Sequence, residues 1–207
     1  MVATALPLPV LMLVTDRKAA GGEAALVRKV AEAVESGANV VQLREKDLGR
    51  RSLVALGREL ARVVTRRALL ISNGARGDAT EMGADGVHLP EAMPLARQSG
   101  LIVGRSVHSV EAAMRAEGEG VDYILAGPVF ATASHPDLQP AGVQLISNIS
   151  SVVSVPVIGI GGITAANAME VMAAGARGVA VIGAILLATD VRAATAALRD
   201  ALDAACR

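Results

Sequence analysis

The chain is poor in aromatic residues and has no excess of charge of either sign. Only 1% of its 207 residues are aromatic and none is tryptophan, while lysine plus arginine equals aspartate plus glutamate at 20 each. Single-stranded nucleic-acid binders stack bases on aromatic side chains. A basic excess would be needed to attract a phosphate backbone or an anionic membrane surface. We therefore expect neither a nucleic-acid partner nor a membrane partner.

Cysteine is also scarce, since Cys206 is the only one. A single cysteine cannot form an internal disulfide and is typical of a reducing compartment. The longest apolar run, residues 178–188, is far shorter than the roughly 20 residues of a membrane helix. No basic segment precedes the apolar stretch of the first 17 residues, as a signal peptide would require. These features predict a cytoplasmic protein.

Short runs of Val, Ile and Leu alternate with longer, Ala-rich amphipathic segments, a pattern typical of successive βα units around a parallel sheet. We predict strands near residues 10–15, 39–45, 68–73, 86–90, 102–107, 122–127, 156–161 and 178–182. Helices are predicted at residues 24–36, 51–65, 110–117, 164–174 and 191–204, with a further brief helix before Gly83. The pattern indicates the α/β class.

Eight strands favour a single-domain (β/α)8 TIM barrel over residues 1–207, although such barrels more often take ~250 residues. The main rival is an open, doubly wound sheet. The first predicted strand is followed by VTDRKAAGG, which lacks the GxGxxG spacing of a dinucleotide site. We therefore expect a barrel, with its active site at the carboxyl ends of the strands.

The second predicted strand lies in VVQLREKD, which changes from apolar to charged at its carboxyl end. Alternate residues of a strand share a face, so Gln42, Arg44 and Lys46 should point into the mouth of the barrel. Two cations and an amide there suit a phosphate or pyrophosphate. Glu45 should point the other way, toward a structural partner. The alternative is a solvated strand end whose two cations pair with Glu45 and Asp47.

Two further segments carry polar side chains after a strand. GRSVHS places Ser106 and His108 on one face, and histidine can act as an acid or base near neutral pH. AGPVFATASHPD ends in Thr132, Ser134 and His135, which could hold oxyanions or could simply form a turn. His88, in GADGVHLPE, is expected to be a buried structural histidine. No Cys/His cluster suggests zinc, and no Ser-His-Asp pattern suggests acyl transfer.

The last two units end in glycine. PVIGIGGITAAN and VAVIGAI place Gly161, Gly162 and Gly183 at strand ends, with Ala184 next in the chain. Glycines let backbone N–H groups approach a phosphate, and the loops after strands 7 and 8 are the usual phosphate site of such barrels. Thr164 is a candidate helix N-cap. These segments predict a phosphate site.

Seven motifs in order over nearly the whole chain resemble the thiamine phosphate synthase superfamily, which includes the synthase and a thiazole tautomerase. The motifs are LMLVTDR, VVQLREKD, GADGVHLPE, VGRSVHSVEAA, VDYILAGPVFAT, VPVIGIGGITAAN and GARGVAVIGAI. The resemblance implies a (β/α)8 barrel that handles a thiazole phosphate in thiamine biosynthesis. It also implies, for the synthase, coupling of hydroxymethylpyrimidine diphosphate to thiazole phosphate, release of pyrophosphate, and use of Mg²⁺.

The chain departs from both members of this superfamily. The synthase pattern has Asn-Asp after strand three, Asp shortly after strand four, and Thr-x-Thr-Lys after strand six. In this chain the Asn-Asp pair reads Asn73-Gly74, so Asn73 remains a candidate ligand. The Asp after strand four falls at Met93, and the Thr-x-Thr-Lys segment is Thr132 to His135. The tautomerase is similar in GRSVHS and in LPE, but Pro128 stands where it has a strand-six histidine.

The absence of both metal aspartates leads us to predict tautomerase-like isomerisation of carboxythiazole phosphate. Such proton movement needs an acid or base, for which His108, His135 and Lys46 are the candidates, and no cofactor. Mg²⁺ is expected only if the chain acts as a synthase. The alternatives are thiamine phosphate synthase and a non-catalytic regulator that binds thiazole phosphate. The expected partner is a small phosphorylated thiazole, and a homodimer remains open.

Overall fold

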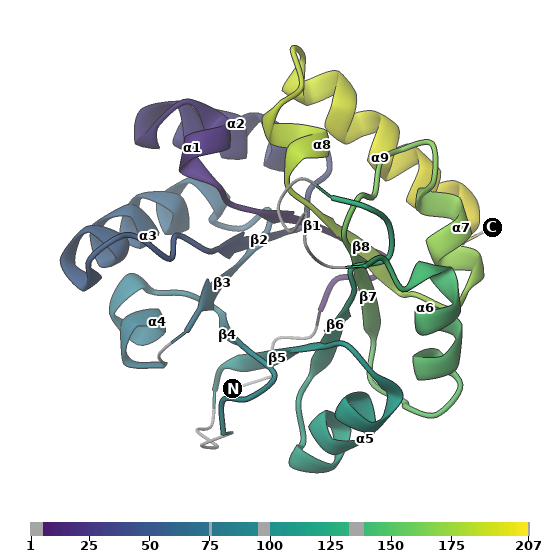
Figure 1. Cartoon of the computed structure of the whole chain (residues 1–207). Coiled ribbons are helices and arrows are strands. Elements are labelled where there is room, and N and C mark those ends of the chain that lie inside the picture. The colour runs from purple at the N-terminus through teal and green to yellow at the C-terminus, as the bar shows by residue number, and fades with distance from the viewer. Residues whose placement is uncertain (1–5, 75, 95–99, 133–138, 207) are drawn as a thin grey trace.

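The computed structural model describes residues 6–74, 76–94, 100–132 and 139–206, and its eight parallel strands form a closed barrel in sequence order (Figure 1). The strands are β1 (Val10–Val14), β2 (Val40–Leu43), β3 (Leu69–Asn73), β4 (Gly86–Leu89), β5 (Ile102–Val107), β6 (Tyr123–Ala126), β7 (Val157–Ile160) and β8 (Gly178–Val181). Closure comes from the pairing of β1 with β8, in which Val10 lies beside Gly178. The predicted single-domain (β/α)8 fold is confirmed.

Helices cover the outside of the barrel (Figure 1). They are α1 (Arg17–Ala20), α2 (Glu23–Glu35), α3 (Arg50–Val64), α4 (Arg76–Met82), α5 (Val110–Glu119), α6 (Gly142–Ser150), α7 (Ala168–Ala173), α8 (Gly183–Leu186) and α9 (Val191–Ala205). The sequence did not predict α1, α6 or α8. In the described residues, no helix is both long and apolar enough to cross a bilayer.

The predicted helix start at Thr164 is wrong. Its backbone N–H donates to Asn167 Oδ1 at 2.8 Å, and the Asn167 amide nitrogen donates to the Gly162 carbonyl at 3.1 Å. These bonds close a turn before α7 begins at Ala168. The turn separates the end of β7 from the helix.

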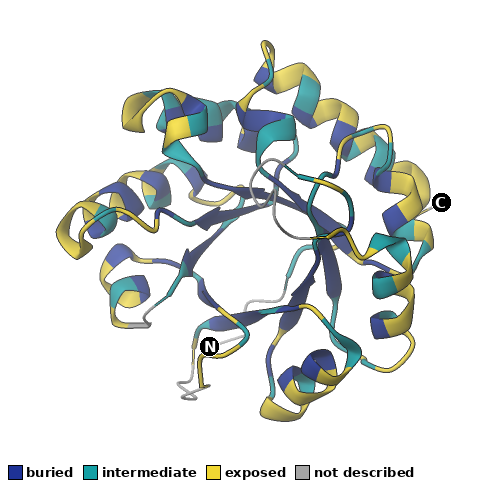
Figure 2. Ribbon diagram, in the orientation of Figure 1, coloured by how far each residue is buried: buried dark blue, intermediate teal, exposed yellow. Residues whose placement is uncertain are grey.

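The strands are buried on both faces (Figure 2). The residues that fill the barrel interior are Val10, Met12, Val14, Val40, Ile71, Ile102, Tyr123, Leu125, Ile158 and Ala180. Alternate residues, such as Leu11 and Leu13 of β1, pack outward in the larger core beneath the helices. Burial on both faces explains why the sequence shows continuous apolar runs rather than an alternating pattern.

Candidate active site

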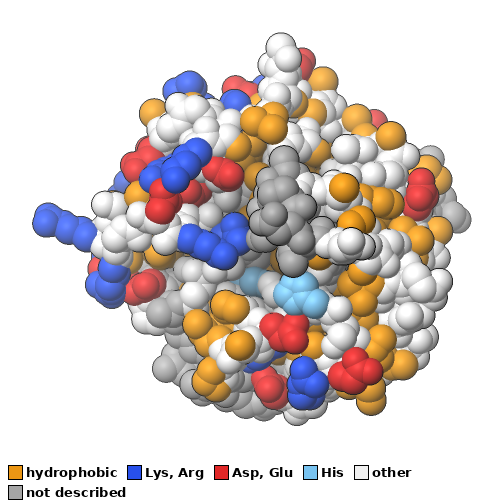
Figure 3. Space-filling view, in the orientation of Figure 1, with side chains coloured by type: hydrophobic (Ala, Val, Ile, Leu, Met, Phe, Trp, Pro, Cys, Tyr) orange, Lys and Arg blue, Asp and Glu red, His pale blue; other side chains and the backbone are white. Residues whose placement is uncertain are grey.

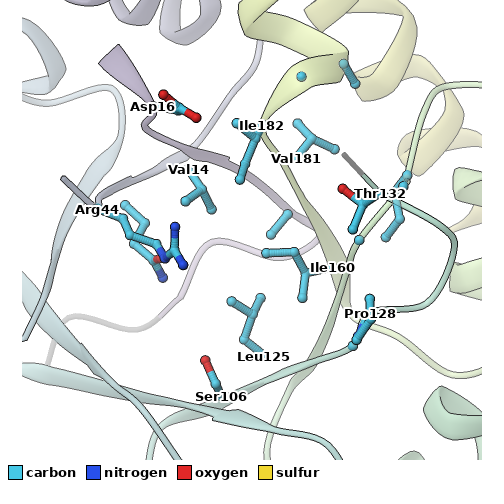
Figure 4. A pocket seen from close by; sticks show the side chains of 18 of the residues that line it. Val14, Asp16, Arg44, Ser106, Leu125, Pro128, Thr132, Ile160, Val181 and Ile182 are labelled. Atoms are coloured by element: carbon cyan, nitrogen blue, oxygen red, sulfur yellow. The ribbon is translucent and has the colours of Figure 1, made fainter. Parts of the chain in front are cut away.

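A cavity of about 670 Å³ lies at the carboxyl ends of the strands (Figure 4). That volume is typical of a site for a small organic ligand. Its apolar lining includes Val14, Leu125, Ile160, Ala180, Val181 and Ile182, and its polar lining includes Asp16, Gln42, Arg44, Lys46, Asn73, Glu91, Ser106, His108, Thr132 and Thr164. Lysine or arginine side chains lie beside histidine near the middle of this face (Figure 3).

Two cations line the β2 side of the cavity. β2 ends at Leu43, so Arg44 and Lys46 stand on the loop beyond the strand, yet both line the cavity as predicted. In the described part of the chain, neither forms an ion pair with a carboxylate. The positive charge of Arg44, followed by burial, lowers the pKa of Lys46. This mutual repulsion would be relieved by an anion bound between them.

The carboxylates of the same loop are held away from these cations. Glu45 accepts hydrogen bonds from the backbone and guanidinium of Arg17 at 3.0 and 3.3 Å. Asp47 pairs with Arg17 at 2.7 Å and with Lys18 at 2.8 Å, and these bonds hold the Asp47 pKa below its usual range. The expected structural partner of Glu45 is therefore confirmed, and the alternative pairing within the loop is wrong.

Glycine backbone lines the cavity after β7 and β8. Gly161 and Gly162 have φ values of +103° and +63°. The carbonyl of Gly161 accepts a hydrogen bond from Phe130 N at 3.0 Å, which fixes this turn against the loop after β6. Gly183 begins the short helix α8. A phosphate site in (β/α)8 barrels is often built from the loops after β7 and β8 and the start of a short extra helix.

The candidate residues at this side of the cavity come together as the sequence predicted. Gly161, Gly162, Gly183 and Ala184 all line the cavity, and Thr132 joins them from the loop after β6. In Figure 4, the Arg44 guanidinium and the Thr132 hydroxyl point into the cavity from different sides. The polar lining thus includes a cationic side at the end of β2 and a side built from glycine backbone after β7 and β8, together with polar side chains from β1, β3, β4 and β5.

Of the two catalytic candidates that the structure describes, His108 and Lys46, His108 is the one nearest to a carboxylate. Its Nδ1 lies 2.8 Å from Glu91 Oε2, and its backbone N–H donates to the same oxygen at 3.1 Å. His108 and Asn73 both line the cavity. The other predicted candidates, Ser134 and His135, lie outside the described residues.

His88 is buried, as expected. The residue is 1% exposed, and burial, followed by the charges of Arg44 and Arg105, lowers its pKa to about 3. Its Nε2 lies 2.8 Å from Ser106 Oγ, which connects the buried ring to the cavity lining.

Stability should therefore depend on the titration of His88. The unfolded chain binds a proton near pH 6.5 and the folded chain only near pH 3, so acidification between these values favours unfolding. The His88 contribution should be complete above about pH 6.5 and fall by about 1.4 kcal/mol per pH unit below it. Denaturant unfolding of the protein and of His88→Gln across this range would measure the effect. Identical pH slopes in the two proteins would contradict it.

The cavity residues that the structure describes do not fit a protein-held Mg²⁺ ion. Among the described residues, the carboxylates that line the cavity are Asp16 and Glu91, which follow β1 and β4. One Asp16 oxygen accepts from two backbone N–H groups of α1, and Glu91 is bound to His108. Gly74 and Met93 stand where the synthase pattern has aspartates. The described residues contain no cluster of three acidic, histidine or cysteine ligands.

Sequence reasoning missed two cavity-related residues. Asp16 lies two residues after the end of β1, so it could have been found by the same search for polar residues after strand ends that found Arg44 and His108. Tyr123 contacts His88 inside the barrel, with its hydroxyl 3.0 Å from His88 Nδ1. No spacing rule could have paired these residues, because they are 35 positions apart.

The fold and the cavity define a (β/α)8 barrel with an anion-binding site at the carboxyl ends of its strands. Residues 11–185 match the family described as thiamine monophosphate synthase. A thiamine-phosphate synthase of Roseiflexus castenholzii is 42% identical over 199 residues, which cover 92% of this chain and 87% of that protein. The chain therefore belongs to the thiamine monophosphate synthase family, whose members act in thiamine biosynthesis.

Other relatives agree over the same length. A thiamine-phosphate synthase of Pyrococcus abyssi is 38% identical over 199 residues, covering 93% of this chain and 94% of its own. The solved structure of a thiamine phosphate pyrophosphorylase from Pyrococcus furiosus has a TM-score of 0.86 and 36% identity, and the match covers 96% of this chain and 97% of that one.

The predicted tautomerase-like function is wrong. It rested on only a few positions of the chain, namely the GRSVHS and LPE segments and the two missing aspartates. Relatives that are 42%, 43% and 44% identical are named thiamine-phosphate synthase. Similarity along nearly the whole barrel therefore favours the reaction that the sequence analysis gave as its alternative.

Proposed function

We propose that the protein is a thiamine-phosphate synthase, a transferase that couples hydroxymethylpyrimidine diphosphate to thiazole phosphate and releases pyrophosphate. The observation that carries this proposal is a single cavity with a cationic side and a glycine-rich side. The reaction brings together two substrates that each carry an anionic group. A proton-moving isomerase with one phosphate substrate would need only one such site.

The cationic side suits the diphosphate. As the carbon–oxygen bond to the diphosphate breaks, the departing oxygen takes the electron pair and negative charge builds on the leaving pyrophosphate. Arg44 and Lys46 have no carboxylate partner in the described chain, so their charges are available to that anion. Preorganised cations that meet developing charge in a partly enclosed site are strong contributors to catalysis.

The glycine side suits the thiazole phosphate. Backbone around Gly161, Gly162 and Gly183 can approach a phosphate more closely than side-chain-bearing backbone can. Leu125, Ile160 and other apolar lining residues lie between the two sides and can contact the heterocyclic rings. The two reacting groups would then meet over an apolar surface that excludes water.

In the family that the chain resembles, the synthase reaction uses Mg²⁺. The described side chains of this cavity, however, do not provide ligands that fit a protein-held ion. We therefore assign no step to a metal. In this proposal, Arg44 and Lys46, on the loop after β2, neutralise the charge of the pyrophosphate. We further propose a cytoplasmic location and small phosphorylated substrates as the partners.

A two-substrate assay tests this function. Purified protein would be incubated with hydroxymethylpyrimidine diphosphate, thiazole phosphate and Mg²⁺, and products would be measured by mass spectrometry. We expect thiamine phosphate and pyrophosphate in equal amounts. The control is the Arg44→Gln/Lys46→Gln double variant, which should form neither. Binding of thiazole phosphate without any coupling in the unaltered protein would instead favour a non-catalytic regulator.

A further inference from the structure

The loop that carries the two cations of the cavity is fixed to the end of β1 by a buried hydroxyl. Thr15 is 0% exposed, and its backbone N–H donates to the Gln42 carbonyl at 2.9 Å. β2 ends at the next residue, Leu43, and the backbone N–H of Arg44 then donates to Thr15 Oγ1 at 2.9 Å. The attachment of the loop to β1 therefore continues through a side chain after the strand has ended.

A second attachment lies at the next residue, Glu45. Its side chain is 3% exposed, and its two carboxylate oxygens accept from the backbone N–H and the guanidinium of Arg17 at 3.0 and 3.3 Å. With Glu45 turned toward α1, its neighbours Arg44 and Lys46 line the cavity. Figure 4 shows the Arg44 side chain pointing into the cavity. The backbone of the loop is thus fixed at Arg44 and at Glu45, directly before Lys46.

These attachments oppose a repulsion between the two cations. The charge of Arg44, followed by burial, lowers the pKa of Lys46, as expected for like charges held close together. A free loop could relieve the repulsion by turning one cation toward solvent or toward Asp47. Asp47 is instead engaged by Arg17 at 2.7 Å and by Lys18 at 2.8 Å. The two cations are consequently held beside each other in advance of a ligand.

Fold stability alone does not account for this arrangement. A nearly buried ion pair such as Arg17 with Glu45 contributes little net stability compared with apolar residues of similar volume, because both charges lose water. Valine has nearly the same shape as threonine and would fill the space of Thr15 without a hydroxyl. What the hydroxyl and the carboxylate supply, and apolar side chains would not, is a fixed direction for the loop backbone.

We propose that Thr15 and Glu45 are positioning residues that hold the loop after β2 so that Arg44 and Lys46 act together on one anion. Neither Thr15 nor Glu45 lines the cavity. Thr15 acts through the backbone of Arg44, and Glu45 acts through the backbone between the two cations. That the anion is the leaving pyrophosphate rests on the proposed function. The placement of the two cations does not, so the two can fail separately.

Nitrogen NMR of the lysine side chains tests the placement without a ligand. The lysines of the chain are Lys18, Lys29 and Lys46, and Lys46→Gln identifies the Lys46 signal. Thr15→Val removes the hydroxyl, so the Arg44 N–H loses its acceptor and the loop should move. We expect the Lys46 pKa to rise toward its value in Arg44→Gln, whereas Thr15→Ser should leave it unchanged. An unchanged Lys46 pKa in Thr15→Val, with or without a change in Arg44→Gln, would overturn the proposal.

The matched control is Thr195→Val in α9. Thr195 is also 0% exposed, and its hydroxyl donates to the Val191 carbonyl at 2.7 Å. This variant loses a buried threonine hydroxyl outside the cavity lining, so its Lys46 pKa should equal that of the unaltered protein. An equal rise in Thr15→Val and Thr195→Val would trace the change to general loosening of the fold and would also overturn the proposal.

Binding of inorganic pyrophosphate, measured by calorimetry, tests the joint action of the two cations. Thr15→Val should weaken binding about tenfold, the usual size for one lost contact to a charged group. In the Arg44→Gln background it should have almost no further effect, because Thr15 acts through Arg44. Equal losses in the two backgrounds would show that Thr15 does not act through Arg44.

Glu45→Gln separates positioning from simple electrostatics. Removal of a negative charge near two cations would by itself strengthen anion binding. If Glu45 positions the loop, pyrophosphate binding should instead weaken about tenfold. Glu59→Gln, at an exposed site on α3 outside the cavity lining, removes the same charge and should change nothing. Stronger or unchanged binding in Glu45→Gln would overturn its role.

The two measurements also separate this proposal from the proposed function. If the unaltered protein bound no pyrophosphate, the proposed function would fail, and the lysine NMR would still decide whether Thr15 holds Arg44 beside Lys46.

Discussion

Arg44→Gln is expected to lower kcat/KM for the coupling reaction by ~10²–10³, the usual cost of removing one preorganised electrostatic contact. The guanidinium lines the cavity and has no carboxylate partner in the described chain, so its charge is free for the leaving pyrophosphate. The substitution also removes the charge that lowers the Lys46 pKa. Steady-state rates with both substrates would measure the effect.

Two variants make this prediction specific. Arg44→Lys keeps the charge but loses the planar guanidinium, so it should recover only part of the lost rate. Arg51→Gln removes an exposed arginine at the start of α3, outside the cavity lining, and should leave kcat/KM unchanged. If Arg44→Gln also kept normal kcat/KM, the cationic side of the cavity would have no role in the reaction.

Gly162→Ala should impair both folding and phosphate binding. Gly162 has φ of +63°, and an added Cβ would meet the Ala131 carbonyl oxygen and approach Phe130 Cβ to 2.7 Å. We expect the free energy of unfolding to fall by ~1–3 kcal/mol, since the backbone must shift or remain strained. Affinity for thiazole phosphate should fall by about tenfold or more, because the loop that presents the backbone N–H groups moves.

The matched control is Gly118→Ala on the exposed side of α5. Gly118 lies in a helix, and an added Cβ would have no neighbour within 4 Å. This change should stabilise the protein by ~0.5–1 kcal/mol and leave binding unaltered. Denaturant unfolding and calorimetry would compare the two variants. Equal effects on binding in both would rule out a local role for the Gly162 turn.

The barrel could be predicted because a strand that is buried on both faces appears in the sequence as a short, continuous apolar run. All eight predicted strands exist, and each overlaps its observed bounds within two residues. The cavity residues followed from the same pattern: since parallel strands end at one rim, Arg44, Ser106 and Gly161 had to gather there. Short elements such as α1 and α8 escaped prediction because four residues leave no measurable period.

The interior hydrogen bonds could not be predicted. Tyr123 reads as one more apolar strand residue, and its contact with His88 depends on the space that Gly104 leaves across the barrel. Likewise, the sequence placed Glu45 on the far face but could not name Arg17 as its partner. These contacts join residues far apart in the chain, and their geometry is set by how the strands are arranged around the barrel.

The reaction was the weakest part of the sequence reasoning. The two aspartates of the synthase pattern, replaced here by Gly74 and Met93, were given more weight than the similarity of the whole chain to the synthases. Physically, a lost metal ligand removes one way to neutralise a leaving group and does not specify another reaction. Arg44 and Lys46 offer a second way within the same cavity, which is consistent with the proposed synthase.

Simultaneous binding of two anions is the most direct test of this account. Thiazole phosphate would be titrated calorimetrically into the protein alone and into protein saturated with inorganic pyrophosphate. We predict that thiazole phosphate still binds with one equivalent when pyrophosphate is present, because the cationic and glycine sides of the cavity are separate sites. Competition, in which pyrophosphate abolishes thiazole phosphate binding, would contradict the account.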